Sequence, residues 1–192
     1  MSMDENDWIG KVLQGDVAAY ENLVGKYQAR LVAFLWNLLG SGDDARDAAQ
    51  DAFVQAYVKL GQFDRSRNFR SWLFAIAYNR GIDLLRKKRS FRLFRQRQIA
   101  SGEPPAAADV GGSIEDSPFW RPVLRKITPQ ERSVLALKYN EDCDSAEIAS
   151  MLGCSESTVR VHLLNARKKL QKELHAAGFA TGPKKPDAEE VS

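Results

Sequence analysis

The chain has 192 residues, of which 44% are hydrophobic and 28% charged, and its formal net charge is +3. This apolar content can form one moderate hydrophobic core or two small ones, which argues against a disordered chain. The longest apolar run, residues 31–39, is well short of the ~20 residues that span a membrane, and the acidic N-terminus lacks a secretory pattern. We therefore expect a globular protein in the cytoplasm.

Three long helices are predicted in the first half of the chain. Apolar residues recur there at intervals of three and four over residues 18–40, 41–63 and 69–90, and the alternation typical of strands is missing. The second helix opens with capping and acidic residues, places Phe53, Ala56 and Tyr57 on its inward face, and stops at Gly61. In the third, Leu73 and Ala77 are predicted to face inward.

Charge is unevenly distributed after the third helix. Residues 83–100 hold seven basic residues and one acid, whereas residues 101–117 hold four acids and no base. The acidic stretch is rich in Pro, Gly, Ala and Ser and has few large apolar groups to offset the entropy of ordering it. We therefore predict a flexible linker at residues 99–117, between one helical domain at 8–98 and another at 118–178, and a polar tail at 179–192.

The second half carries the pattern of a helix-turn-helix. Thr128, Pro129 and Glu131 have the spacing of a capping box with proline in its favoured position. A short apolar helix then ends at Gly153, which tolerates a left-handed turn, and Ser155 can cap the helix that follows. Two short helices joined by such a turn are typical of DNA-binding modules.

The last helix has two different faces. Val159, Leu163, Ala166, Leu170 and Leu174 fall on one side and are predicted to face the core. The opposite side carries Ser157, Val161, Leu164, Asn165, Lys168 and Lys172, with Arg160 on its flank. Polar groups, an amide and cations suit a groove of DNA, although the solvated face of a small bundle is the alternative.

These segments resemble the extracytoplasmic-function (ECF) sigma factors, a group of the sigma-70 family. "GDVAAYENLVGKY", "DDARDAAQDAFVQAY" and "FRSWLFAIAYNRGIDLLRKK" have the order and spacing of that family's region 2. "ITPQERSVLALKY" and "SAEIASMLGCSESTVRVHLLNARKKL" resemble its region 4. The combination is more specific than a helix-turn-helix alone.

The resemblance implies an all-α fold of two small helical domains, a region 2 bundle and a region 4 helix-turn-helix. Region 2 would bind the β′ clamp helices of core RNA polymerase and open the −10 element. Region 4 would read the −35 element and contact the β flap. The protein would direct promoter-specific transcription initiation, without enzymatic activity, cofactor, small-molecule substrate or membrane insertion, and an anti-sigma factor would control it in an extracytoplasmic or stress response.

Polymerase binding is implied for one set of acidic and amide residues on the second predicted helix: Asp44, Asp47, Gln50 and Asp51. The alternative is that these acids only stabilise the helix N-terminus. Arg46, Ala48 and Ala49 depart from the residues that are commoner in the family at these positions.

Contacts with −10 DNA are implied for the following loop and the third helix. The candidates are Arg65, Ser66, Arg67, Asn68, Phe69, Arg70, Trp72, Arg80, Arg86, Lys87 and Lys88. Cations can hold single-stranded phosphates while aromatic surfaces hold bases, and in the family the loop captures a flipped base. Aromatic residues at helical spacing are also typical of a core, and the loop could be an ordinary turn.

Contacts with the −35 element are implied for the last helix: Ser157, Thr158, Arg160, Val161, Leu164, Asn165 and Lys168. Cys143 and Cys154, even with His162, do not make a zinc site, so no metal is expected. A second hypothesis stays open at this point. The chain could be a helix-turn-helix regulator whose first domain serves dimerisation or signal reception.

Overall fold

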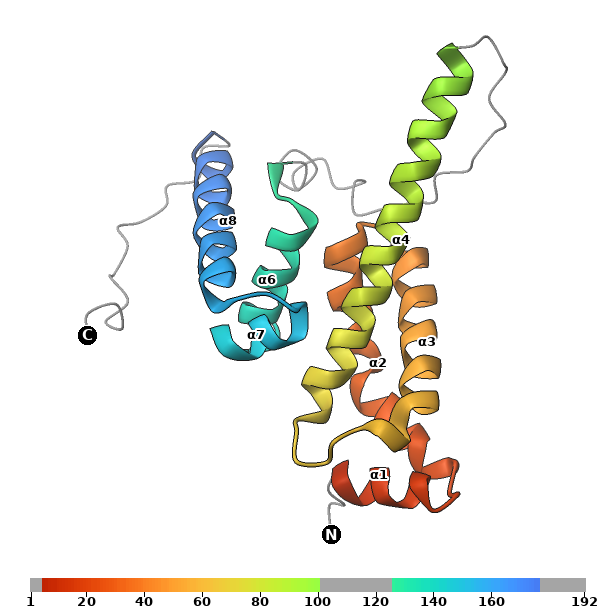
Figure 1. Ribbon diagram of the computed structural model, residues 1–192. Coiled ribbons are helices and arrows are strands. Elements are labelled where there is room, and N and C mark those ends of the chain that lie inside the picture. The colour runs from red at the N-terminus through yellow and green to blue at the C-terminus, as the bar shows by residue number, and fades with distance from the viewer. Residues whose placement is uncertain (1–4, 101–125, 177–192) are drawn as a thin grey trace, which may run out of the picture.

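The computed structural model describes residues 5–100 and 126–176, and in these parts the regular elements are all helical (Figure 1). The all-α prediction is confirmed. The helices are α1 (Glu5–Leu13), α2 (Ala18–Leu39), α3 (Gly42–Lys59), the short 3₁₀ turn η1 (Leu60–Gln62), α4 (Phe69–Ala100), α6 (Pro129–Tyr139), α7 (Ser145–Leu152) and α8 (Glu156–Ala176). Of these, α1 was not among the helices predicted from the sequence.

A tight turn joins α2 to α3 and sets them side by side. Gly40 ends α2 with φ 73°, a left-handed conformation that glycine adopts without strain, and its N–H bonds the Trp36 carbonyl oxygen. Ser41 then caps α3 by accepting a hydrogen bond from the N–H of Asp44. The two helices run antiparallel and contact each other along their length (Figure 1).

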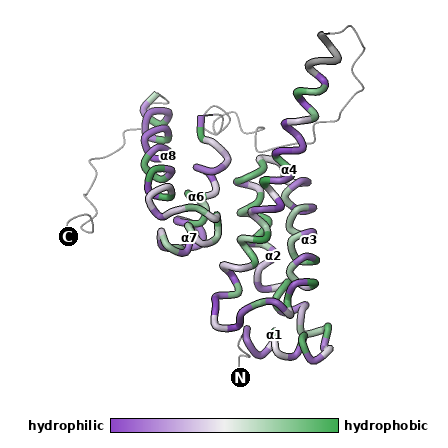
Figure 2. Tube along the Cα trace, viewed as in Figure 1, coloured by the Kyte–Doolittle hydropathy of each residue, from purple (hydrophilic) through white to green (hydrophobic). Residues whose placement is uncertain are grey.

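The long helix α4 packs across α2 and α3 and then continues beyond them (Figure 1). Phe74 lies against Phe34 with ring centroids 5.3 Å apart. At Gly81 the packing is so close that a Cβ would lie 2.4 Å from Leu38 Cδ2. Past this point purple hydrophilic residues alternate with green ones on the projecting end (Figure 2). Because α4 ends at Ala100, the helix extends past residue 98, the predicted end of the first domain.

The second half folds as the capping pattern predicts. Thr128 and Glu131 form a reciprocal capping box at the start of α6. Asp144 and Glu147 form another at the start of α7. Gly153 ends α7 in the left-handed conformation, with φ 65°. The helix-turn-helix of α7 and α8 is therefore present.

The two halves share one hydrophobic core. The buried cluster that includes Leu31 and Leu38 of α2 continues into Val134 and Leu137 of α6 and Ile148 of α7. Helix α6 contacts α2, and α7 contacts α4. Apart from the end of α4, the predicted linker at 99–117 and the predicted tail at 179–192 lie outside the described residues. The described halves are thus packed against each other.

Candidate polymerase and nucleic-acid interfaces

The outer face of α8 is a mixed polar and apolar surface. Val159, Leu163 and Ala166 are buried against α6 and α7, as the sequence predicted. On the other side Val161 and Leu164 are 54% and 47% exposed. The remaining predicted −35 residues that are exposed are Ser157, Arg160, Asn165 and Lys168, while Thr158 is half-buried. This surface can offer hydrogen bonds and apolar contacts to base edges together.

Cations on α8 fall into two groups. Lys169 donates to both carboxylate oxygens of buried Glu131, at 2.8 and 2.7 Å, and ties α8 to α6. Arg167 donates to the Tyr139 hydroxyl at 2.9 and 2.7 Å. By contrast, Arg160 pairs only across one exposed turn with Glu156, at 3.2 Å. Such an exposed pair contributes little stability, so Arg160 can exchange this partner for DNA.

The loop between η1 and α4 has an internal hydrogen-bond network. Asp64 accepts from both the N–H and the hydroxyl of Ser66, at 3.0 and 2.7 Å. These hydrogen bonds and the charge of Arg67 lower the pKa of Asp64. Asn68 accepts from the N–H of Ser71 at 3.2 Å, and Arg65 donates to the carbonyl oxygen of Asn6 at 2.8 Å. Ser66, Arg67 and Asn68 are exposed, so the loop is preshaped and open to solvent.

The two aromatic −10 candidates differ in exposure. Phe69 is 2% exposed and lies in a cluster with Tyr27, Phe63 and Trp72. In this arrangement burial leaves no ring face of Phe69 open to a base, and the DNA contact of Phe69 stays a prediction. Trp72 is half-buried at the edge of the same cluster. It remains available as an apolar surface.

Two of the predicted DNA-binding cations pair with predicted polymerase-binding acids. Arg80 donates to Asp51 Oδ2 at 3.0 and 2.7 Å, and Lys88 pairs with Asp44. Both pairs join α4 to α3. Arg86 pairs with Asp83 at 3.2 Å within α4 itself, and Lys87 is exposed. Arg70 instead donates hydrogen bonds to Glu141 and Glu147 in the second half of the chain. The two predicted surfaces are therefore adjacent and electrostatically coupled.

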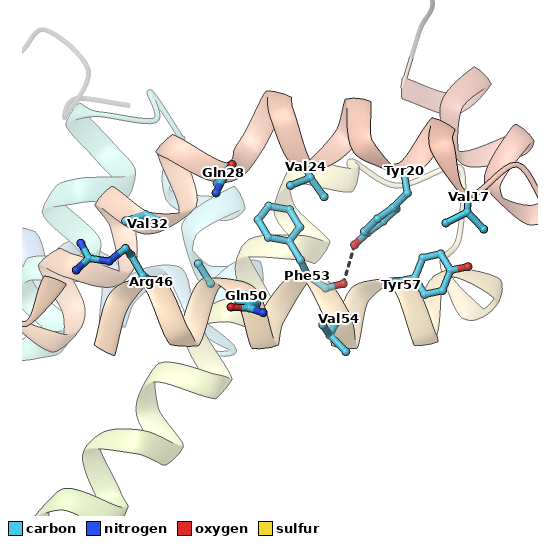
Figure 3. A pocket seen from close by; sticks show the side chains of 11 residues that line it. Val17, Tyr20, Val24, Gln28, Val32, Arg46, Gln50, Phe53, Val54 and Tyr57 are labelled. Atoms are coloured by element: carbon cyan, nitrogen blue, oxygen red, sulfur yellow. Dashed lines mark hydrogen bonds between the residues drawn. The ribbon is translucent and has the colours of Figure 1, made fainter. Parts of the chain in front are cut away.

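An apolar groove of about 550 Å³ runs between α2 and α3 (Figure 3). Gln50, a predicted polymerase-binding residue, lines it together with Val24, Val54 and Tyr57. At its floor the Tyr20 hydroxyl donates to the Phe53 carbonyl oxygen at 2.7 Å, and burial raises the pKa of Tyr20. Asp47 is exposed and has no ion pair within the described residues.

The groove includes residues that the sequence analysis missed. Tyr57, predicted to face inward, is 41% exposed, and Val54 is exposed as well. Val58 of the same helix is also exposed, although it is not among the residues that line the groove. The inward stripe of α3 is formed by alanines and Phe53. The sequence did contain a signal for a binding surface here. Val54 and Val58 are four residues apart and do not belong to the inward stripe, and two apolar residues on a solvent face of a helix suggest a binding surface.

Neither cysteine forms part of a metal site in the described portion of the chain. No cluster of three metal-ligating side chains occurs there. Burial raises the pKa of Cys143 to about 11, and burial also raises the pKa of Cys154. Both are therefore thiols at neutral pH. Among the helices described, none has the length and apolarity needed to cross a membrane.

Comparison with known proteins identifies the family. Residues 23–91 match the model of Sigma-70 region 2, and residues 123–170 match that of Sigma-70 region 4. The ECF RNA polymerase sigma factor SigW of Bacillus subtilis is 31% identical over 179 residues, which cover 86% of this chain and 94% of SigW. The chain therefore belongs to the sigma-70 family of RNA polymerase sigma factors, in its ECF group.

Other relatives and solved structures agree. The RNA polymerase sigma-H factor of Pseudomonas aeruginosa is 27% identical, covering 86% of this chain and 91% of that protein. The structure of CnrH in complex with the cytosolic domain of CnrY has a TM-score of 0.63 at 28% identity, covering 88% of this chain and 96% of CnrH. The sigma factor RpoE of Bartonella quintana was solved with the anti-sigma factor NepR, and its structure has a TM-score of 0.64 at 24% identity. The match covers 83% of this chain and 98% of that chain, so the two share the fold.

Proposed function

We propose that this protein binds core RNA polymerase through the α2–α3 groove and directs it to promoters with −10 and −35 elements. One observation carries the proposal: matches to regions 2 and 4 occur in order on one chain, and each has an exposed surface of suitable chemistry. Clamp helices would place apolar side chains against Val54 and Tyr57 and arginines against Asp47 and Asp51.

Promoter reading is divided between α8 and α4. On α8, Arg160, Val161, Leu164 and Asn165 would contact base edges of the −35 duplex, and Lys168 would contact phosphate. On α4, Arg80, Arg86, Lys87 and Lys88 would hold the phosphates of the opened −10 strand beside Trp72.

The loop before α4 would capture a base of the −10 element. Ser66, Arg67 and Asn68 are exposed on a preshaped loop, which lowers the entropy lost on binding. Flipping a base costs a few kcal/mol of stacking that these contacts would offset. Replacing the three residues together by alanine should flatten sequence preference at one −10 position. Unchanged preference and unchanged permanganate reactivity at −10 would make the loop a connector.

An anti-sigma factor is the proposed regulator. Two similar proteins were solved with bound partners, CnrH with CnrY and RpoE with NepR. We expect the partner to cover the α3 surface from Asp47 to Asp51, because this would block polymerase binding. Pull-down from unstressed cells should recover it in place of polymerase, and recovery of polymerase alone would contradict this part of the proposal.

In vitro transcription tests the central proposal. Core polymerase supplemented with this protein should initiate from a subset of a promoter library, whereas the protein alone should produce no transcript. Core polymerase that stays silent on the whole library, despite a helical circular dichroism spectrum of the added protein, would overturn it.

A further inference from the structure

The loop between η1 and α4 has two buried ends and an exposed tip. Phe63 and Phe69 are 7% and 2% exposed, and their ring centroids lie 5.5 Å apart in the aromatic cluster. The tip between them, residues 64–68, is exposed. Because packing acts on the buried ends, it fixes where the loop begins and ends, and the orientation of the tip must be set by other contacts.

Hydrogen bonds among neighbouring residues give the tip its shape. The Asp64 side chain accepts from the N–H of Ser66, and the Asp64 carbonyl oxygen accepts from the N–H of Arg67 at 2.9 Å. Asn68 accepts from the N–H of Ser71 and so caps α4. These bonds span at most three residues, so they shape the tip without tying it to a helix other than α4.

Arg65 ties the tip to α1. Its Nη2 donates to the carbonyl oxygen of Asn6, in the first turn of α1, at 2.8 Å. The two residues are 59 positions apart along the chain. A guanidinium is a donor only, and a carbonyl oxygen is a matching acceptor. This bond therefore holds the tip against an element that is distant in the sequence.

Gly10 leaves the space that this guanidinium occupies. A Cβ at Gly10 would lie 3.4 Å from Arg65 Nη2 and 3.9 Å from its Cζ. A Cβ alone would make ordinary van der Waals contact, but a longer side chain would compete with the guanidinium for this space. Glycine is unfavourable inside a helix, and Gly10 lies in the interior of α1. The position of Arg65 gives a physical reason for a glycine here.

Helix α1 is a firm support for this contact. Ile9 and Val12 are 0% and 8% exposed and belong to the hydrophobic core. At the start of the helix, Glu5 pairs with Lys26 of α2 and accepts a hydrogen bond from the Tyr27 hydroxyl. Because α1 is joined to the bundle by both kinds of contact, a loop that is bonded to α1 is held in place by the bundle.

We propose that Arg65 is a positioning residue, which holds the tip of the loop on α1 and thereby sets the preference for the captured −10 base without touching DNA. The proposal rests on the proposed function for its DNA step, whereas the anchoring can be tested on the free protein. A loop held in its binding conformation loses less entropy on binding, so its release should lower affinity most for the base that the loop recognises. The alternative is the contact implied by the family resemblance, in which Arg65 binds DNA directly.

Hydrogen exchange on the free protein tests the anchoring. Arg65→Ala removes the bond, and Gly10→Leu displaces the guanidinium from the α1 side. In both variants the N–H groups of Ser66 and Arg67 should exchange about fivefold faster, the factor that corresponds to losing a hydrogen bond worth about 1 kcal/mol. Gly25→Leu is the control and should leave loop exchange unchanged, because this exposed glycine of α2 has open space around an added Cβ. Helicity should be retained, since leucine favours a helix more than glycine does.

Transcription tests the consequence for promoter reading. The promoter is one selected from the library, and the captured position is the one at which alanine replacement of Ser66, Arg67 and Asn68 flattens the preference. There, the ratio of transcription with the best base to transcription with the other bases should fall about three- to fivefold in Arg65→Ala and in Gly10→Leu. A direct phosphate contact predicts a different result: Arg65→Ala would weaken all sequences alike, and Gly10→Leu would leave transcription unchanged.

The double variant tests whether both changes act on one contact. Arg65→Ala combined with Gly10→Leu should match Arg65→Ala alone in loop exchange and in base preference, because the leucine then occupies space that the arginine has left. Residues that share one interaction are not additive. Additive effects of the two substitutions would contradict the proposal.

The outcomes separate the anchoring from the proposed function. Unchanged exchange in both single variants would overturn the anchoring, and faster exchange with unchanged base preference would overturn the positioning role. If exchange is faster but the alanine replacement in the loop flattens no preference, the anchoring stands and the proposed capture of a base fails. A Gly10→Leu protein that loses helicity is replaced by Gly10→Met, whose flexible side chain enters the same space. The same faster exchange is then expected, and unchanged exchange counts against the anchoring.

Discussion

Exposed ion pairs between α3 and α4 join residues of the proposed polymerase-binding surface to residues of the proposed DNA-binding surface. Arg80 and Asp51 are each about half exposed, and such pairs contribute about 0–1 kcal/mol. The pair is therefore too weak to be a main source of stability, but it reduces the charge that either residue presents to a partner. Polymerase arginines and DNA phosphates can replace these partners at low cost.

Removing one acid should release its cation for DNA. Asp51→Asn leaves Arg80 without its carboxylate partner, so affinity of the free protein for single-stranded DNA should rise about two- to threefold, consistent with a pair worth about 0.5 kcal/mol. Polymerase affinity should fall in the same variant. Fluorescence anisotropy measures both. Asp43→Asn, which also removes an exposed acid from α3 but leaves Arg80 paired, is the control, and an equal rise in that variant would contradict the coupling.

On α8, adjacent cations should differ in their effect on specificity. Arg160→Ala should cost about 1–3 kcal/mol in −35 affinity and relax preference at one base pair, whereas Lys168→Ala should weaken all sequences alike. Competition binding with single-substituted −35 duplexes measures the difference. Equal, sequence-independent losses from both substitutions would refute the division of roles.

Sequence periodicity predicted which side of a helix is buried, but it could not predict which residues of other helices a side chain contacts. It placed Val159 inside and Val161 outside, as the structure has them, because a helix repeat fixes orientation. It could not distinguish Lys169, held by buried Glu131, from exposed Lys168 one residue earlier. The inward placement of Tyr57 was wrong, and the burial of Phe69 was left open, for a related reason: burial of an aromatic residue at a helix end or edge depends on neighbouring helices.

At the scale of elements, close helix packing depends on two kinds of contact. Helices α2 and α4 approach each other through a glycine, and α6 and α8 are joined by an ion pair between partly exposed Lys169 and buried Glu131. The capping signals predicted where α3, α6 and α8 begin, because a cap is a local interaction. The close approach at Gly81 was not predicted, since it depends on residues more than forty positions away along the chain.

Adding a methyl group at Gly81 should strain the α2–α4 contact. A Cβ there would meet Leu38 Cδ2 at 2.4 Å and Leu35 Cδ2 at 3.2 Å, and both leucines are fully buried. Gly81→Ala should therefore lower the free energy of unfolding by about 1–3 kcal/mol. Gly25→Ala, in a helix with open space around the added carbon, should instead stabilise by about 0.5–1 kcal/mol. Urea denaturation compares the two, and stabilisation by both would contradict the close packing.

The Glu131–Lys169 pair should make stability depend on acid pH. Burial opposes ionisation of Glu131, but hydrogen bonds from Lys169 and the Thr128 N–H outweigh it and lower its pKa below the ordinary 4.5. A lowered folded-state pKa means that the contribution is full above pH ~4.5 and is lost as the pH falls through the folded value. Lys169→Met should flatten this part of the stability profile, measured by thermal unfolding from pH 3 to 7. An unchanged slope would show that other carboxylates dominate.

At the scale of the whole molecule, the protein presents separate surfaces on one packed body. The α2–α3 groove and the outer face of α8 belong to different halves. Composition predicted two domains and a linker, but not that the halves would share a core. Arg70 was predicted to contact DNA, and nothing local in the sequence marks Arg30, Arg70 or Arg132 as bridges to distant helices.

Because the groove and the outer face of α8 are separate surfaces, we expect that polymerase binding and −35 duplex binding can be impaired independently. Val54→Asp places a charge in the apolar groove at an exposed position, so it should weaken polymerase binding at least about tenfold, the effect of losing 1.4 kcal/mol, while −35 duplex binding stays unchanged. Val161→Asp should do the reverse, because a carboxylate on the outer face of α8 repels phosphate and removes an apolar base contact. Anisotropy with core polymerase and with −35 duplex gives the two affinities for each variant. Circular dichroism confirms folding, which both exposed sites should tolerate. Loss of both activities from either substitution would show that groove and recognition helix act as one surface, and the proposed division between polymerase and promoter binding would fail.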